Sequence, residues 1–152
     1  MRRLEALGAA ATGEAKALVM SAETLLCRQM PRERFLQNVI EITPDMRVEP
    51  TELVARLVEA GYERTALVEA RGQCALRGGI LDVYPVGMPE AVRLEFFDEE
   101  IDRVSQVDTT TGHALANLRH AAVYPASHYA TSREHIDEAI GSIERDLDAR
   151  CA

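Results

Sequence analysis

The sequence predicts an α+β (mixed α/β) fold: an antiparallel β-sheet domain with flanking helices, preceded by a fragment of an adjoining α/β domain. Between Tyr62 and Tyr124, short apolar segments alternate with turn residues, which is typical of antiparallel strands joined by short connections. On both sides of this region, apolar residues recur at helical spacing. Residues 1–30 offer a single apolar strand between helix-like segments, which is too little to build a domain.

Residues 1–47 are expected to be the end of the adjoining α/β domain and its connector. We expect a helix over residues 4–11 and a short apolar strand over residues 16–20. Residues 21–26 begin with a serine, a preferred helix N-cap, and predict a second helix. A further strand is expected over residues 38–42, before the proline that follows.

Residues 48–130 are expected to form the sheet domain, which opens with a helix that ends at Gly61. The helix is indicated by apolar residues at helical spacing, namely Leu53, Val54, Leu57 and Val58. Strands are expected at about 64–70, 73–77, 79–84, 91–97, 100–107 and 118–124. The Gly78-Gly79 pair indicates a bulge or a close backbone approach between strands.

Residues 131–152 are expected to form a C-terminal helix that leads into the remainder of a longer parent chain. Thr131 to Glu134 match a capping box, which opens helices. The helix is further indicated by a narrow apolar stripe, made of Ile136, Ala139, Ile140, Ile143 and Leu147.

Composition limits the function classes. The formal net charge of -8 argues against binding nucleic acid through a general basic surface. Among the 17 basic residues Lys16 is the sole lysine, which favours planar, bidentate contacts through arginine. No apolar run approaches the roughly 18 residues that a membrane span needs, so no membrane partner and a cytoplasmic location are expected.

Motifs for catalysis and for metal or cofactor binding are missing. Lys16 lies between alanines, outside any phosphate-binding loop, so the fragment is not expected to hydrolyse ATP. Acidic clusters such as Asp98-Glu99-Glu100 fall in turns or on a solvated helix face, where nothing shifts a carboxyl pKa for catalysis. No catalytic residue, metal or cofactor is therefore expected, although three cysteines and four histidines occur: Cys27, Cys74, Cys151, His113, His120, His128 and His135.

Three sequence segments resemble one known module. They are LVEAGYERTALVEARGQCALRGGILDVYP at residues 57–85, AVRLEFFDEEIDRVSQVDTTTGHAL at 91–115 and YPASHYATSRE at 124–134. The module is the second domain of UvrB and its counterpart in the transcription-repair coupling factor, Mfd. Ala75 and Gly79 favour the coupling factor as the parent, whereas SHYATSRE is closer to UvrB, the alternative parent.

The resemblance implies a surface that binds UvrA, the damage-recognition ATPase of nucleotide excision repair. Four contact residues carry over, Arg64, Arg77, Arg93 and Glu95, and Arg71 in the turn before Gly72 is a further candidate. One family arginine falls on Ala75. The resemblance also implies an ATP-driven translocase or helicase-like parent with ATP and Mg in its motor domains, and with DNA and RNA polymerase as further partners.

Alternation along a strand supports part of this hypothesis independently. Arg93 and Glu95 must share one face, while Val92, Leu94 and Phe96 share the other and pack. The simpler interpretation is that these charged residues are solvated or form cross-strand pairs. A DNA-contacting part of a repair helicase, a hydrolase, and a base-stacking platform made of Phe96, Phe97 and Tyr84 remain as alternatives.

Overall fold

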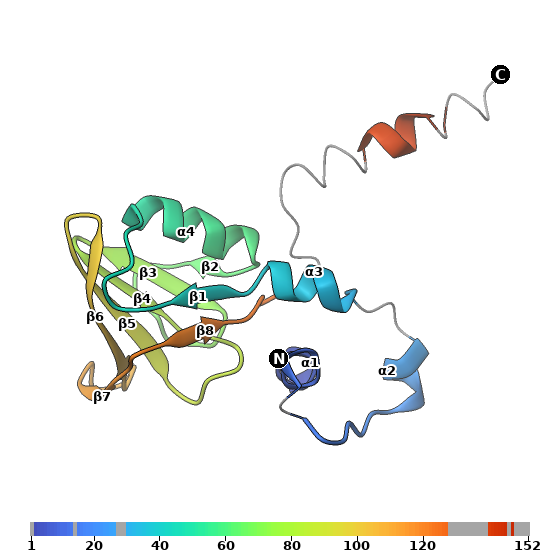
Figure 1. Cartoon of the computed structure of the whole chain (residues 1–152), viewed down its shortest axis with the longest axis horizontal. Coiled ribbons are helices and arrows are strands. Elements are labelled where there is room, and N and C mark those ends of the chain that lie inside the picture. The colour runs from blue at the N-terminus through green and yellow to red at the C-terminus, as the bar shows by residue number, and fades with distance from the viewer. Residues whose placement is uncertain (1, 14, 27–29, 128–139, 146, 148–152) are drawn as a thin grey trace.

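The computed structural model describes residues 2–13, 15–26, 30–127, 140–145 and 147 (Figure 1). The helices are α1 (Arg2–Thr12), α2 (Ala22–Leu26), α3 (Arg32–Gln37) and α4 (Pro50–Glu59). The strands are β1 (Ile40–Ile42), β2 (Glu63–Arg64), β3 (Gln73–Arg77), β4 (Ile80–Val83), β5 (Ala91–Phe97), β6 (Glu100–Val107), β7 (Ala114–Asn117) and β8 (Ala121–Val123).

A six-stranded sheet in the order β2-β3-β4-β5-β6-β7 dominates the fold. Each strand from β3 to β6 pairs in antiparallel fashion with the strand that follows it, and β2 runs parallel to its neighbour β3. Sequence neighbours are therefore spatial neighbours, as short turns require. The predicted α+β fold with an antiparallel sheet and flanking helices is confirmed.

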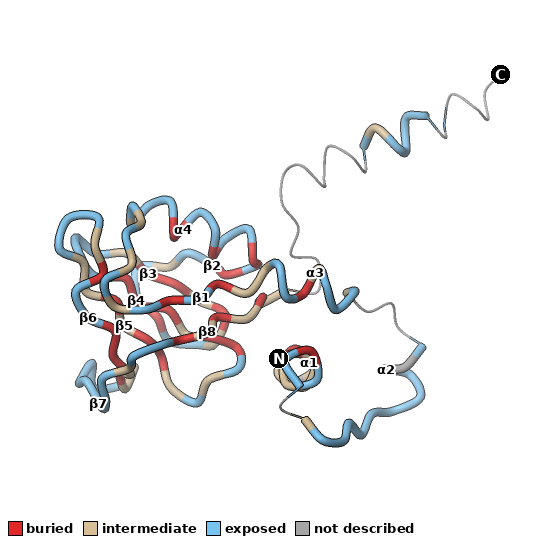
Figure 2. The backbone as a smooth tube through the Cα atoms, viewed as in Figure 1, coloured by how far each residue is buried: buried red, intermediate tan, exposed pale blue. Residues whose placement is uncertain are grey.

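The main core lies between this sheet and α4 (Figure 2). Helix α4 begins at Pro50, where a missing N–H costs nothing, and the Glu49 carboxylate accepts the amide of Glu52 at 2.9 Å as an N-cap. Leu53 and Leu57 are fully buried against the sheet. Val58, which the helical spacing included, is exposed because it lies on the outer side of the helix.

The β1–β8 ribbon completes this core. Strand β1 pairs antiparallel with β8, and Ile40, Ile42 and Val123 from the two strands are buried in the same cluster as α4. The strand expected over residues 38–42 is thus confirmed for residues 40–42, whereas Asn38 is the C-cap of α3, a helix that the sequence did not predict. The domain division proposed after residue 47 stays a prediction, but β1 packs as part of the sheet domain.

The turn between β3 and β4 explains the glycine pair. Gly78 has a φ of +60°, a left-handed conformation that glycine adopts without strain. A Cβ on Gly79 would lie 3.1 Å from the carbonyl oxygen of Phe96, and the Phe96 amide donates to the Gly79 carbonyl at 2.7 Å. The expected close backbone approach between strands is confirmed.

Within the sheet, one expected strand is much shorter than predicted, and another strand was not predicted. The strand expected at 64–70 ends at Arg64, because the amides of Glu69 and Ala70 donate to the Gln73 side chain instead of to a neighbouring strand. Strand β7 was not predicted, since all of its residues are exposed and no apolar alternation marks it.

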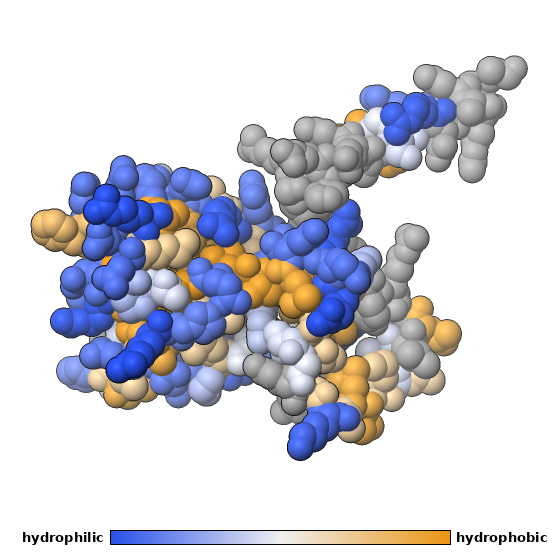
Figure 3. Space-filling model, viewed as in Figure 1, coloured by the Kyte–Doolittle hydropathy of each residue, from blue (hydrophilic) through white to orange (hydrophobic). Residues whose placement is uncertain are grey.

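The N-terminal segment forms helices but no strand. Helices α1 and α2 confirm the predicted ones, and the Ser21 hydroxyl accepts the Thr24 amide at 3.3 Å. The strand predicted over residues 16–20 is wrong: the segment is irregular, and Val19 is 97% exposed. No described strand lies beside it to pair with its backbone, and Figure 3 shows apolar surface over the stretch between α1 and α2.

Contacts tie α1 to the sheet domain. Helix α1 packs against α3, and Gly8 lies against the ring of Tyr124. The capping box at residues 131–134 lies outside the described residues, whereas residues 140–145 and 147 are helical. Within the described ranges, no helix is long and apolar enough to cross a membrane.

Candidate partner-binding face

The face of the sheet opposite α4 carries a group of charged side chains. Strand register aligns Ala75, Asp82, Arg93 and Ser105 in one row across β3 to β6, and aligns Arg77, Ile80, Glu95 and Arg103 in the next row. Directly paired residues point to the same side of a sheet. We call the group formed by Arg77, Asp82, Arg93, Glu95 and Arg103 the arginine face.

Asp82 is the centre of the arginine face. Its buried carboxylate accepts Arg77 Nη2 at 2.7 Å on Oδ2, Arg93 Nε at 2.7 Å on Oδ1 and Arg93 Nη2 at 3.0 Å on Oδ2. The two arginines thus satisfy a charge that would be costly to bury alone. Asp82 was not among the predicted site residues, although a single carboxylate inside the apolar strand ILDV was a usable signal.

Arg93 and Arg77 differ in how many of their hydrogen-bond donors lack a partner among the described residues. Arg93 also donates from Nη1 to the Gly112 carbonyl at 3.2 Å, so each of its three nitrogens has a partner, and its side chain is 22% exposed. Hydrogen bonding to Asp82 raises the pKa of Arg93 further. Arg77 uses only Nη2 among the described contacts, and its side chain is 48% exposed. Arg77 therefore presents free donors to a partner, whereas Arg93 holds the carboxylate.

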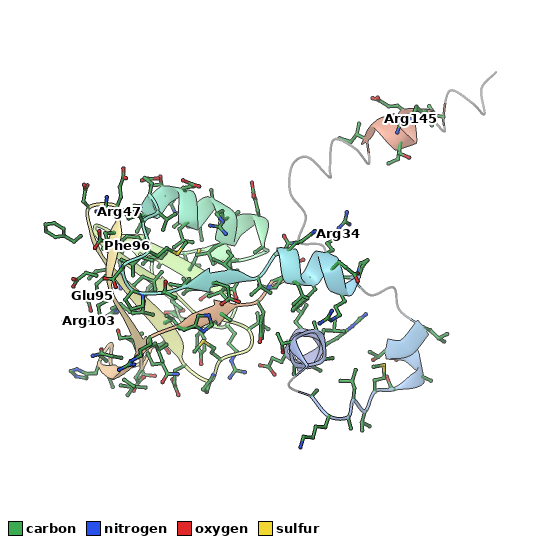
Figure 4. The ribbon with its side chains drawn as sticks, in the orientation of Figure 1. Arg34, Arg47, Glu95, Phe96, Arg103 and Arg145 are labelled. Atoms are coloured by element: carbon green, nitrogen blue, oxygen red, sulfur yellow. The ribbon has the colours of Figure 1, made fainter. Side chains whose placement is uncertain are left out.

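Glu95 and Arg103 form the outer part of the arginine face, on β5 and β6 (Figure 4). Their side chains approach to 3.7 Å, and both are well exposed. Such a pair contributes little to stability, because solvent screens it. Arg103 was not among the predicted site residues. The available signal was alternation along β6, which puts Arg103 on the same face as Ser105, two residues further along the strand.

Arg64 does not join this group. Strand β2 places Arg64 in register with Cys74, which is buried in the α4 core, so Arg64 belongs to the opposite face from Arg77 and Arg93. Sequence alone leaves open whether sheet pairing brings Arg64 onto the side of Arg93, and the register places it on the other side. Arg64 is exposed and forms no ion pair with a described residue, and its binding role stays a prediction.

Arg71 makes an internal contact. Its guanidinium lies 3.0 Å from the Glu5 carboxylate on α1 and 5.7 Å from the centre of the Tyr84 ring. These contacts give Arg71 a role in holding α1 against the sheet domain. A direct binding role for Arg71 also stays a prediction.

Comparison with known families decides what this domain is. The family described as "UvrB interaction domain" matches residues 40–129. The chain belongs to the UvrB interaction domain family. The match begins at β1 and runs through the whole six-stranded sheet, so it includes every residue of the arginine face.

Curated relatives agree with this assignment. UvrABC system protein B of Enterococcus faecalis is 37% identical over 121 residues, which cover 79% of this chain and 18% of that protein. The protein of the same name from Clostridium beijerinckii is 40% identical over 119 residues, covering 78% and 18% respectively. The chain therefore spans less than a fifth of the length of these relatives.

The aromatic residues of this interaction domain do not form one platform. Phe96 packs against the core on the α4 side, as alternation predicts, whereas Phe97 next to it on β5 points to the other side and is 80% exposed. The Tyr84 hydroxyl donates to the Pro89 carbonyl at 2.9 Å. A base-stacking surface made of these three rings is not supported.

Potential metal ligands do not gather in the described part of the chain, where no group of three such residues is found. His120 lies against the Glu41 carboxylate on the β1–β8 ribbon, and His113 is in the loop that precedes β7. His128 and His135 lie outside the described residues.

Proposed function

We propose that this interaction domain docks onto UvrA through its arginine face, and that Arg77 makes the main contact. The observation that carries the proposal is the Asp82 carboxylate, which holds Arg77 and Arg93 in fixed positions on the face of the sheet opposite α4. A side chain that is fixed before binding loses less entropy when a partner arrives.

The free donors of Arg77 suit a carboxylate on the partner. A guanidinium can hold a carboxylate with two parallel hydrogen bonds, and an arginine near an interface centre often contributes about 2 kcal/mol or more. Lysine cannot reproduce this geometry. The partner surface would therefore be acidic where it meets Arg77.

For the parent protein we propose UvrB. The relatives above carry that name and support it better than the coupling factor, which Ala75 and Gly79 had favoured. The parent would be an ATP-driven, helicase-like repair protein that contacts DNA in the cytoplasm. RNA polymerase would be a partner only of a coupling-factor parent.

Direct DNA binding by this domain is the weaker function. The chain has a net charge of -8, and the carboxylates of Asp82 and Glu95 lie among the arginines of the arginine face. Phosphate binding needs concentrated, unpaired cations. An affinity for duplex DNA that falls steeply with added salt would favour this alternative.

The test is a calorimetric titration of the chain against UvrA from the same organism. We expect binding that Arg77→Ala weakens by roughly 2 kcal/mol. Arg56→Ala is the matched control, because Arg56 is an exposed arginine on the outer side of α4. Binding that tolerates Arg77→Ala would move the site away from the arginine face, and no binding would remove the proposed function.

A further inference from the structure

We propose that α1 is held on the sheet domain by a latch that opens while the sheet domain stays folded. The first contact of the latch is the ion pair between Glu5 on α1 and Arg71 in the loop before β3. The second contact is the Tyr124 ring, which lies against Gly8 on α1. The inference does not rest on the proposed function, because it concerns contacts within the chain.

The ion pair joins α1 to a loop that is itself fixed. Arg71 Nη1 lies 3.0 Å from Oε1 of Glu5, and the Arg71 guanidinium carbon lies 5.7 Å from the centre of the Tyr84 ring. The Gln73 side chain accepts the amides of the two residues that precede Arg71, which holds the loop in place. The side chains of Arg71 and Glu5 are 37% and 32% exposed, so water can replace the ion pair without leaving a fully buried charge.

The Tyr124 ring is the seat on which α1 rests. A Cβ on Gly8 would lie 2.8 Å from Cδ2 of this ring, and a Cβ on Gly87 in the β4–β5 loop would lie 2.7 Å from the same atom. The Tyr124 carbonyl accepts the Tyr62 hydroxyl at 2.8 Å, which ties Tyr124 to the sheet domain. Position 8 therefore has room for the ring only because it is a glycine.

Helix α1 contributes to neither hydrophobic core of the sheet domain. Its buried hydrophobic side chains, Leu4 and Ala11, belong to neither of the two core clusters. Instead α1 packs against α3, where Arg32 Nε donates to the Ala11 carbonyl at 2.9 Å. Release of α1 would thus leave the core between the sheet and α4 intact, which is the condition for opening without global unfolding.

Hydrogen exchange resolved by segment tests the latch in the whole chain, because amide exchange reports the opening free energy of each segment. Arg71→Met removes the ion pair without changing α1, and Gly8→Leu places a side chain where the Tyr124 ring lies. We expect the α1 amides to exchange roughly three- to five-fold faster in Arg71→Met and about ten-fold or more faster in Gly8→Leu. Exchange in β4, β5 and β6 should stay unchanged. Leucine is a better helix former than glycine, so faster exchange in Gly8→Leu would not come from helix propensity.

Two control variants match these substitutions. Arg56→Met changes an exposed arginine on α4, and Ala10→Leu changes an exposed residue of α1, so both should leave α1 exchange unchanged. Unchanged α1 exchange in either Arg71→Met or Gly8→Leu would overturn the proposal. Equal acceleration in α1 and in the sheet would also overturn it, because α1 would then be released only by global unfolding.

Discussion

Asp82 and Arg93 face each other across β4 and β5 and form the least exposed ion pair among the described residues, with Nε to Oδ1 at 2.7 Å and Nη2 to Oδ2 at 3.0 Å. The pair is bidentate, the strongest geometry for an arginine and a carboxylate. The same Asp82 carboxylate also holds a second arginine, Arg77. The position of the free donors of Arg77 thus depends on the buried carboxylate of Asp82.

Replacing Asp82 is therefore expected to affect both stability and binding. Asp82→Ala leaves Arg93 without two of its three acceptors, and we expect a loss of roughly 2 kcal/mol in the free energy of unfolding, measured in urea. Hydration of the partly exposed arginines keeps the loss below that of a fully buried pair. Glu95→Ala is the control, and it is expected to change stability by less than about 0.5 kcal/mol. Equal losses for the two variants would contradict the central role of Asp82.

The packing of α4 against the sheet can be tested with substitutions at two adjacent residues of this helix. Leu57 is fully buried against the sheet, so Leu57→Ala is expected to lower the free energy of unfolding by about 2–5 kcal/mol. Val58→Ala changes the exposed side of the same helix and is expected to cost less than about 0.5 kcal/mol. A small effect of Leu57→Ala would show that α4 does not cover the sheet as described.

The buried hydroxyl of Tyr62 leads us to expect that the free energy of unfolding depends on pH in the alkaline range. Burial raises the pKa of Tyr62 above its ordinary value of 10.0, and its hydroxyl donates to the Tyr124 carbonyl at 2.8 Å. Below pH 10.0 both the folded and the unfolded chain keep this proton. Above it the unfolded chain releases the proton first, so the free energy of unfolding should fall by about 1.4 kcal/mol per pH unit until the folded pKa is passed.

Chemical denaturation between pH 9 and pH 12, on the order of half a unit apart, checks this slope. Tyr62→Phe is expected to be less stable by about 1 kcal/mol at neutral pH and to lose the part of the alkaline slope that Tyr62 causes. Tyr84→Phe is the control, because the Tyr84 hydroxyl bonds the Pro89 carbonyl at the surface. The idea is wrong if Tyr62→Phe and Tyr84→Phe have the same alkaline slope.

Much of the fold could be predicted because local patterns and tertiary packing agree in it. The Leu53 and Leu57 spacing identified α4, and alternation in β5 separated Val92 and Leu94 from Arg93 and Glu95. The strand predicted over residues 16–20 is wrong because an apolar run forms a strand only where a neighbouring strand can pair with its backbone. Strand β7 carries no apolar face, so periodicity could not reveal it.

The candidate site was predictable only in part. Alternation placed Arg93 and Glu95 on one face, and the resemblance implied Arg77 as a further contact residue. The strand register puts Arg77 on the face that carries Arg93 and Glu95. The face that carries Arg64 could not be predicted, since the parallel pairing of β2 with β3 cannot be read from composition. Asp82 and Arg103 were missed because their importance depends on which residues lie across from them in neighbouring strands.

The most direct test of the account is photo-crosslinking to UvrA from the two sides of the sheet domain. A photoreactive residue at Ile80 would lie in the centre of the arginine-face row, and one at Val58 would lie on the outer side of α4; both positions are exposed. We expect a crosslink to UvrA from position 80 and none from position 58. A crosslink from position 58 with none from position 80 would contradict docking through the arginine face.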